Sequence, residues 1–180
     1  MCQILLPLSN YRLMIIIYTY SEVCTIFLYI NPNSHAVKQM NYVIVYWSRY
    51  GNGKKVVDYL GNKLNEKKGK TQIFKTDEAD PTNMPKADLY IFSAATEAFN
   101  IQKNMRTFMK DLKDMENKRY AIINTHAMEK NRLYKMEKLL SKKNMVKVAE
   151  VDFKVGKDAN TGSGLMNGWE VKLDEFAWKL

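Results

Sequence analysis

The sequence predicts an α/β fold in which helices cover both faces of a doubly wound parallel sheet. From residue 40 onward, short runs of β-branched and aromatic residues alternate with segments whose apolar residues recur at helical spacing. This alternation is typical of crossover units, because parallel strands need a connection long enough to hold a helix. With 180 residues, 46% of them apolar, the chain can bury one core of this kind.

Residues 1–39 are expected to be an apolar N-terminal extension to a domain that spans residues 40–180. The first forty residues carry three charged side chains and none of the eight glycines. Three interpretations stay open: an upstream stretch before a true start at Met40, a membrane anchor or secretory signal around residues 13–30, or a folded addition. Glu22 argues against a span, because a charge near its centre costs about 2.5–3.5 kcal/mol.

The first elements of the domain follow in order. Residues 42–47 are a continuous β-branched and aromatic run, as expected of a strand covered on both faces. Residues 53–68 follow as a helix that Gly69 ends, and residues 71–75 predict a second strand at the edge of the sheet. The apolar face of this helix consists of Val56, Val57, Leu60 and Leu64.

The later elements repeat this pattern. Strands are predicted at residues 87–93, 119–124 and 148–153, each followed by a helical stripe. The three stripes are Met105, Phe108, Met109, Leu112 and Met115; Leu133, Met136, Leu139 and Leu140; and Trp169, Leu173, Phe176, Ala177 and Leu180. Five strands and four helical stripes predict one domain, whose ligands should lie beyond the carboxyl ends of the strands.

The loop after the first strand has the composition of an anion site. It reads Ser48, Arg49, Tyr50, Gly51, Asn52 and Gly53 and runs directly into the first predicted helix. Its two glycines allow a tight turn, and the free N–H groups and dipole of the helix start favour a phosphate. The alternative is a tight strand-to-helix turn with no ligand.

This strand and loop resemble the flavodoxin family, whose phosphate loop reads Ser/Thr-x-Thr-Gly-Asn-Thr, and the resemblance extends over residues 40–180. It implies a five-stranded parallel sheet of order 2-1-3-4-5 and a bound flavin mononucleotide (FMN). Carried over by position, Ser48 is a hydroxyl donor to the phosphate, while Gly51 and Asn52 are backbone and amide donors. Tyr50 and Gly53 stand where the family usually has threonines.

Two further segments resemble the family's flavin-contacting loops. The first, after the third strand, implies ring contacts from Ala94, Ala95, Thr96, Glu97, Ala98, Phe99 and Asn100. Phe99 is the candidate stacking residue, and the alternative is that Phe99 packs beneath its loop. The second, after the fourth strand, implies contacts with the pyrimidine edge from Asn124, Thr125, His126 and Ala127. His126 is a candidate donor or titrating group, and the alternative is an exposed loop histidine with no role. Residues 156–168 are too irregular to interpret.

Composition excludes several functions and suggests a partner. Two cysteines and two histidines leave no disulfide framework, metal cluster or nucleophile with a base, so we expect a cytoplasmic protein without these sites. The net charge of +9 suits acidic, ferredoxin-like redox partners if the lysine clusters lie near the flavin; otherwise these lysines only solvate helices. The clusters are Lys54-Lys55, Lys67-Lys68-Lys70 and Lys142-Lys143. No nucleic-acid recognition motif is present.

We therefore expect an FMN-binding, low-potential electron carrier between redox proteins. Two alternatives remain. One is an oxidoreductase of the same fold that acts on a quinone or porphyrinogen-like substrate, which needs a cavity beside the flavin. The other is a flavin-free module that binds a phosphorylated ligand or a protein.

Overall fold

The structure is a computed structural model that describes residues 14–20, 23–29, 39–97 and 99–180. The chain divides into two compact units, Met1–Lys38 and Gln39–Leu180. In the first unit, strand β1 (Met14–Tyr20) pairs antiparallel with β2 (Val23–Tyr29). None of the helices in the described ranges has both the length and the apolar character needed to cross a bilayer.

The second unit is built on a parallel sheet with the predicted strand order. Its five parallel strands are β3 (Asn41–Tyr46), β4 (Lys70–Lys75), β5 (Leu89–Glu97), β7 (Arg119–His126) and β8 (Val146–Lys154). They lie side by side as β4-β3-β5-β7-β8, which is the order 2-1-3-4-5 counted along this unit. The second strand of the unit lies at the edge, as predicted.

Strands β5 and β7 run further than the sequence pattern indicates. β5 continues to Glu97 and then turns into β6 (Asn100–Ile101), which pairs with it antiparallel. β7 continues to His126, because its backbone stays paired with β5 and β8 beyond the apolar run. The polar residues at these strand ends interrupt the apolar pattern from which strands are predicted. Both segments that resemble flavin-contacting loops begin inside a strand.

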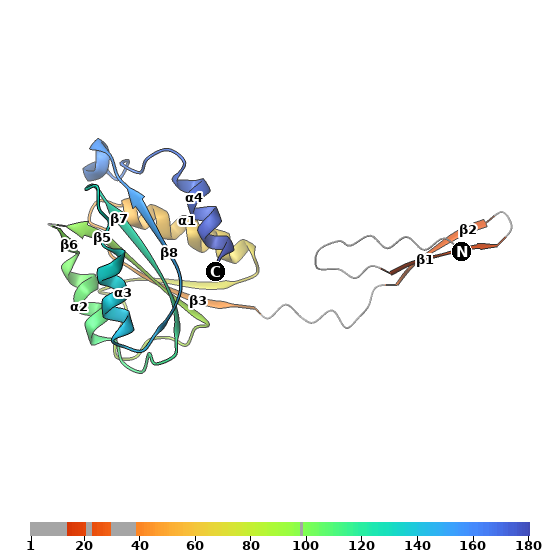
Figure 1. The fold of residues 1–180 in the computed structure, drawn as a ribbon, viewed down its shortest axis with the longest axis horizontal. Helices are drawn as coiled ribbons and strands as arrows, with labels where there is room; N and C mark the ends of the chain where they lie inside the picture. Colours follow the sequence, from red (N-terminus) through yellow and green to blue (C-terminus); the bar gives the residue numbers. More distant parts are fainter. Residues whose placement is uncertain (1–13, 21–22, 30–38, 98) are drawn as a thin grey trace. The chain divides into compact units, whose positions relative to one another are not determined.

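Four α-helices cover the sheet, two on each face (Figure 1). They are α1 (Asn52–Glu66), α2 (Lys103–Asp111), α3 (Leu133–Ser141) and α4 (Trp169–Trp178). A short 3₁₀ helix, η1 (Lys157–Thr161), precedes α4. Leu112 and Met115 lie past the end of α2 but stay buried, so the apolar stripe there continues beyond the helix that it predicts.

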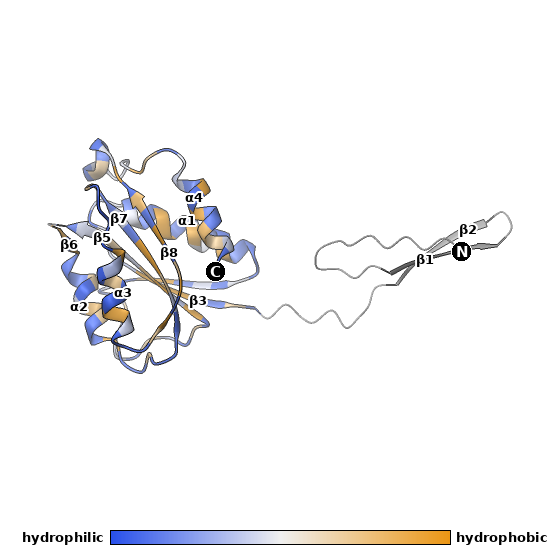
Figure 2. Ribbon diagram, viewed as in Figure 1, coloured by the Kyte–Doolittle hydropathy of each residue, from blue (hydrophilic) through white to orange (hydrophobic). Residues whose placement is uncertain are grey.

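The core forms two layers because strand side chains alternate between the faces of the sheet. On β5, Tyr90 and Phe92 pack with α2 and α3, while Leu89 and Ile91 pack with α1 and α4. Figure 2 shows apolar residues along the strands of the sheet and polar ones on the outer surfaces of the helices. Both layers are continuous along the sheet, so the strand ends above them are held on a rigid base.

Gly69 follows α1, as predicted, but for a steric reason. Lys68, not Gly69, takes the left-handed conformation, with φ of 63°. A Cβ on Gly69 would lie 2.7 Å from both the Leu64 carbonyl oxygen and the Tyr42 ring. Glycine is therefore required here for close approach rather than for backbone freedom.

Candidate functional site

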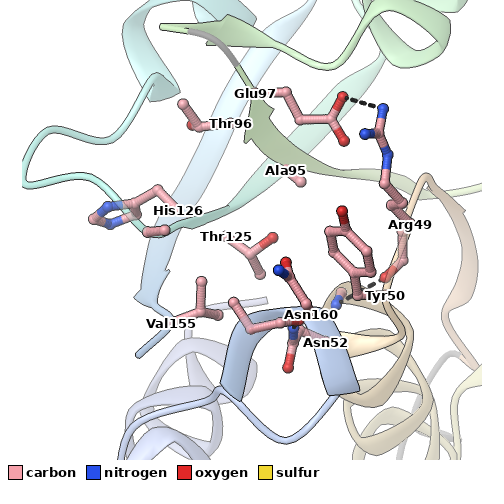
Figure 3. A pocket seen from close by; sticks show the side chains of 14 residues that line it. Arg49, Tyr50, Asn52, Ala95, Thr96, Glu97, Thr125, His126, Val155 and Asn160 are labelled. Carbon is pink, nitrogen blue, oxygen red and sulfur yellow. Dashed lines mark hydrogen bonds and ion pairs between the residues drawn. The ribbon is translucent and has the colours of Figure 1, made fainter. Parts of the chain in front are cut away.

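A cavity of about 130 Å³ lies at the carboxyl ends of β3, β5, β7 and β8 (Figure 3). Its lining residues come from four segments: Ser48, Arg49, Tyr50, Asn52 and Gly53; Ala95, Thr96 and Glu97; Thr125, His126 and Ala127; and Val155, Ala159 and Asn160. The structure thus brings together all three segments that were predicted to form a site. It adds a fourth, from the stretch that the sequence left without an interpretation.

The loop that follows β3 is wound around the hydroxyl of Ser48. The Ser48 Oγ accepts hydrogen bonds from the N–H groups of Gly51 and Gly53, both at 3.1 Å. Gly51 takes the left-handed conformation, with φ of 92°, which glycine adopts at little cost. The helix then begins, and the Lys55 N–H donates to the Gly51 carbonyl at 2.9 Å.

Asn52 joins this loop to the segment before α4. Its side-chain nitrogen donates to the Ala159 carbonyl at 2.6 Å, and its side-chain oxygen accepts from the Gly164 N–H at 3.0 Å. The side chain of Asn52 is therefore committed to the protein in this structure, whereas the resemblance implies a donor to phosphate. Gly162 lies so close that a Cβ on it would be 2.5 Å from the Tyr50 carbonyl oxygen.

The segment around η1 supplies the residues that sequence reasoning missed. Val155, Ala159 and Asn160 line the cavity, but none of them carries a chemical signature. The sequence signal in this stretch is its four glycines, Gly156, Gly162, Gly164 and Gly168. They indicate a close backbone contact but do not identify the segment that is contacted.

An ion pair joins two residues of the cavity lining. The Arg49 guanidinium lies 3.0 Å from the Glu97 carboxylate, and Figure 3 shows the two side chains meeting at the edge of the site. Tyr50, which replaces a family threonine, also lines the cavity and is 46% exposed. An aromatic ring therefore lies at the mouth where the resemblance implies a hydroxyl.

The segment formed by the end of β5 and the turn that follows reaches the cavity only in part. Ala95, Thr96 and Glu97 line it, whereas Ala94 is buried in the core. Ala98 lies outside the described residues. Phe99 and Asn100 do not line the cavity. Phe99 is 65% exposed, so the expectation that it packs beneath its loop is wrong.

Asn124 does not face the cavity either, and it fixes the segments that do. Its side chain is fully buried and donates to the Ala94 carbonyl at 2.8 Å. Its Oδ1 accepts from the Thr96 hydroxyl at 3.0 Å and from the Arg132 N–H at 2.8 Å. Asn124 is thus a positioning residue for the ends of β5 and β7.

His126 is 4% exposed, so the alternative of an exposed loop histidine is wrong. It lines the cavity, with its Nε2 2.7 Å from the Asp152 carboxylate and its Nδ1 2.5 Å from the Met128 carbonyl oxygen. Lys172 donates to the same carboxylate at 3.3 Å. Burial alone would raise the pKa of Asp152, but the hydrogen bond from His126 and the charge of Lys172 bring that pKa below its usual value.

The predicted lysine clusters do not share one end of the molecule. Lys54 and Lys55 lie in the first turn of α1, beside the cavity. Lys67 and Lys68 come just before β4, and Lys70, the first residue of β4, pairs with Asn41, the first residue of β3. This cluster therefore lies at the opposite end of the sheet from the cavity. Lys142 and Lys143 follow α3 and come before the pairing of Val146 with Arg119, also at the opposite end. Only one of the three clusters is near the cavity.

The site has the donors that an anion requires. Helix α1 begins at the cavity, and its first N–H groups have no partner within the helix. Two main-chain N–H groups converge on one oxygen, the Ser48 Oγ, and can converge in the same way on a phosphate oxygen. The residues present therefore fit the phosphate of a flavin nucleotide. Among the described residues, no group of three or more acidic, histidine or cysteine side chains could hold a metal ion.

Comparisons with solved structures give the same fold. A flavodoxin from an archaeon is 15% identical, with a TM-score of 0.61, over 77% of this chain and 94% of that one. A flavodoxin from Streptococcus pneumoniae is 18% identical, with a TM-score of 0.62, over 78% and 97%. A variant of the flavo di-iron protein from Thermotoga maritima is 22% identical, with a TM-score of 0.63; 79% of this chain matches 35% of that one.

A comparison of sequences identifies the family. No curated protein sequence matches this chain. A family model described as a flavodoxin domain matches residues 43–155, which is more than half of the chain and includes the Ser48 loop, β5 and His126. The chain belongs to the flavodoxin family.

Proposed function

We propose that this protein binds FMN and works in the cytoplasm as a low-potential electron carrier between redox proteins. The observation that carries the proposal is the pair of N–H groups, from Gly51 and Gly53, that converge at the start of α1 beside a cavity walled by the strand ends. The two N–H groups already point at one oxygen, the Ser48 Oγ, so their directions suit a phosphate oxygen that takes its place.

The phosphate would lie at the N-terminus of α1. There the Gly51 and Gly53 N–H groups exchange the Ser48 oxygen for a phosphate oxygen, while the Ser48 hydroxyl becomes a donor. Asn52 contributes indirectly, because its two hydrogen bonds fix η1 against the loop. Binding would thus depend mainly on main-chain donors and the helix dipole, with Arg49 held aside by Glu97.

The flavin ring would lie at the rim of the cavity. The cavity has a volume of about 130 Å³, below the roughly 300 Å³ at which pockets for drug-sized ligands begin. The phosphate and the ribityl chain of FMN would therefore enter the cavity, while the flavin ring stays at its mouth. Tyr50 is the aromatic side chain placed to cover the ring there. When bound, FMN supplies electron transfer in one- or two-electron steps, and the protein shields and orients it.

A carrier is favoured over an enzyme. An oxidoreductase that converts a quinone needs a substrate cavity beside the flavin, and the cavity at the strand ends would be taken up by the phosphate and chain of FMN. The similarity to two flavodoxins over nearly their whole length agrees with a carrier. The chain spans 35% of the flavo di-iron protein, so the activity of such larger proteins is not carried over.

The decisive experiment is a titration of the full chain with FMN and, in parallel, with riboflavin, which lacks the phosphate. We expect saturable quenching of FMN fluorescence and at least about tenfold weaker binding of riboflavin, because the phosphate contributes charge-assisted hydrogen bonds. Equal affinity for both flavins would contradict the role of the Ser48 loop. A colourless protein that takes up no FMN but is stabilised by inorganic phosphate would favour the flavin-free alternative.

A further inference from the structure

We propose that Phe99, Arg132, Tyr134 and Lys135 form a docking surface, here called the rim patch, for an acidic redox protein. The inference rests on the proposed function, because it places the partner beside the flavin. It differs from the expectation drawn from the lysine clusters, two of which lie at the opposite end of the sheet.

Phe99 is held outward at the tip of the β5–β6 turn. Its φ of 64° is a left-handed conformation, which costs a residue with a side chain roughly 1–2 kcal/mol. Its carbonyl oxygen accepts hydrogen bonds from the Arg132 Nε at 2.9 Å and the Lys135 Nζ at 3.0 Å. Two cations therefore fix the main chain of a residue that is itself 65% exposed.

Tyr134 places a second aromatic ring beside these cations. It lies in the first turn of α3, is 60% exposed, and its ring centre is 6.0 Å from the Lys135 Nζ. Lys135 also donates to the Asn100 side chain at 3.3 Å, which joins α3 to the turn. The two aromatic residues thus belong to one surface that is held together by hydrogen bonds.

The charge of the rim patch is not balanced by carboxylates. Arg132 and Lys135 make no ion pair with any acidic side chain of the described residues; their hydrogen bonds go to carbonyl oxygens and one amide. By contrast, Arg49 pairs with Glu97, and Lys54 pairs with Asp58. Exposed aromatic rings next to unpaired cations have the composition of an interface anchor, and the charge selects an acidic partner.

The rim patch is directly connected to the cavity. Thr96 and Glu97, in the strand that leads to Phe99, line the cavity, and Arg132 is hydrogen-bonded through its N–H to Asn124 at the end of β7. A protein docked on the patch would therefore bring its redox centre next to the flavin.

The first test removes the ring of Phe99. Asparagine tolerates the left-handed conformation, so Phe99→Asn keeps the main-chain clamp and lowers backbone strain while it removes the ring. The matched control is Trp178→Asn, at an exposed aromatic residue near the end of α4. With an acidic [2Fe–2S] ferredoxin as the probe, we expect the FMN-loaded Phe99→Asn protein to bind about fivefold more weakly and the control to bind as wild type.

The second test compares the loss of one lysine charge at each end of α3. Lys135→Gln removes a cation of the rim patch and retains a hydrogen-bond donor, while Lys142→Gln removes one just past the far end of α3. We expect Lys135→Gln to weaken ferredoxin binding several-fold and to flatten its dependence on salt, because a charge at the rim acts mainly on association. Equal losses in both variants would show that only net charge matters and would overturn the proposal.

The two proposals can fail separately. Each variant is titrated with FMN before it is mixed with ferredoxin. If Phe99→Asn weakens FMN binding and leaves ferredoxin binding unchanged, Phe99 is a flavin-stacking residue and the docking surface is refuted. If neither the wild type nor any variant binds FMN, the proposed function fails. Ferredoxin binding to the flavin-free chain still tests the rim patch in that case.

Discussion

The two walls of the cavity are built from different kinds of interaction. One wall, formed by the Ser48 loop and residues 157–164, is held by neutral hydrogen bonds from main-chain groups, one hydroxyl and one amide. The other wall, at the ends of β5, β7 and β8, contains His126, which is hydrogen-bonded to Asp152 beside Lys172, and it leads outside the cavity lining to the cations that hold Phe99. We call them the neutral wall and the charged wall.

This difference indicates a division of work. Main-chain donors have fixed directions, so the neutral wall can bind a phosphate without a neutralising cation. Charged side chains act over longer distances and respond to pH and salt, so in the proposed function the charged wall would adjust the flavin and meet the partner. Changes in the neutral wall should therefore act through packing, and changes in the charged wall through electrostatics.

The largest effect is expected from Gly162→Ala in the neutral wall. Its φ is 74°, and the added Cβ would meet the Tyr50 carbonyl oxygen at 2.5 Å, so strain and overlap add to about 3 kcal/mol. Gly168→Ala is the matched control, because its φ is 82° and nothing lies within 4 Å of the added Cβ. It should cost only about 1 kcal/mol.

Chemical denaturation of the two variants and FMN titration measure this difference. If Gly162→Ala and Gly168→Ala lose equal stability, the contact between η1 and the Ser48 loop contributes nothing beyond backbone strain. The comparison of the two walls would then lose its basis.

A smaller, pH-dependent effect is expected from Asp152→Asn in the charged wall. Removing the carboxylate takes away a hydrogen-bond partner of the buried His126, which costs about 2 kcal/mol. Because the pKa of Asp152 is lowered in the folded protein, its stabilisation is present above the unfolded value near 3.9 and is lost as pH falls through the folded pKa.

The stability difference between wild type and Asp152→Asn should therefore shrink as pH falls below about 4. Urea denaturation at several pH values measures it. A difference that stays unchanged down to pH 2 would show that the carboxylate acts through packing, as in the neutral wall.

The smallest effect is expected from Glu97→Gln, where the two walls meet. The Arg49–Glu97 pair is exposed, so stability should change by less than about 1 kcal/mol. Freed from Glu97, Arg49 can approach the phosphate, and FMN should bind about two- to threefold more tightly at low salt and equally at high salt. Tighter binding that persists in high salt would argue against this electrostatic explanation.

The sequence predicted most of the fold because apolar periodicity reports burial directly. The run at residues 42–47 and the stripe of Val56, Val57, Leu60 and Leu64 gave the first strand and helix within a few residues. The ends of β5 and β7 were missed because Thr96, Thr125 and His126 are polar, and their strand pairing depends on neighbouring strands rather than on local pattern.

The candidate site was predicted in the same uneven way. The Ser48 loop could be identified because its two glycines and the following helix are local signals. The roles of Asn52 and His126 were not visible, since their partners, Ala159 and Asp152, are 107 and 26 residues away. The exposure of Phe99 depends on Arg132 and Lys135, from another element.

The sequence by itself thus determined the α/β order of elements and the turn before α1, because both follow from neighbouring residues. It also determined the positive charge, which follows from composition. Only the tertiary structure decided which donors are free, which side chains are committed to the protein and where the unbalanced cations lie. The physical reason is that hydrogen bonds and ion pairs require groups within a few ångströms, and only packing of the strand ends brings residues so distant in sequence together.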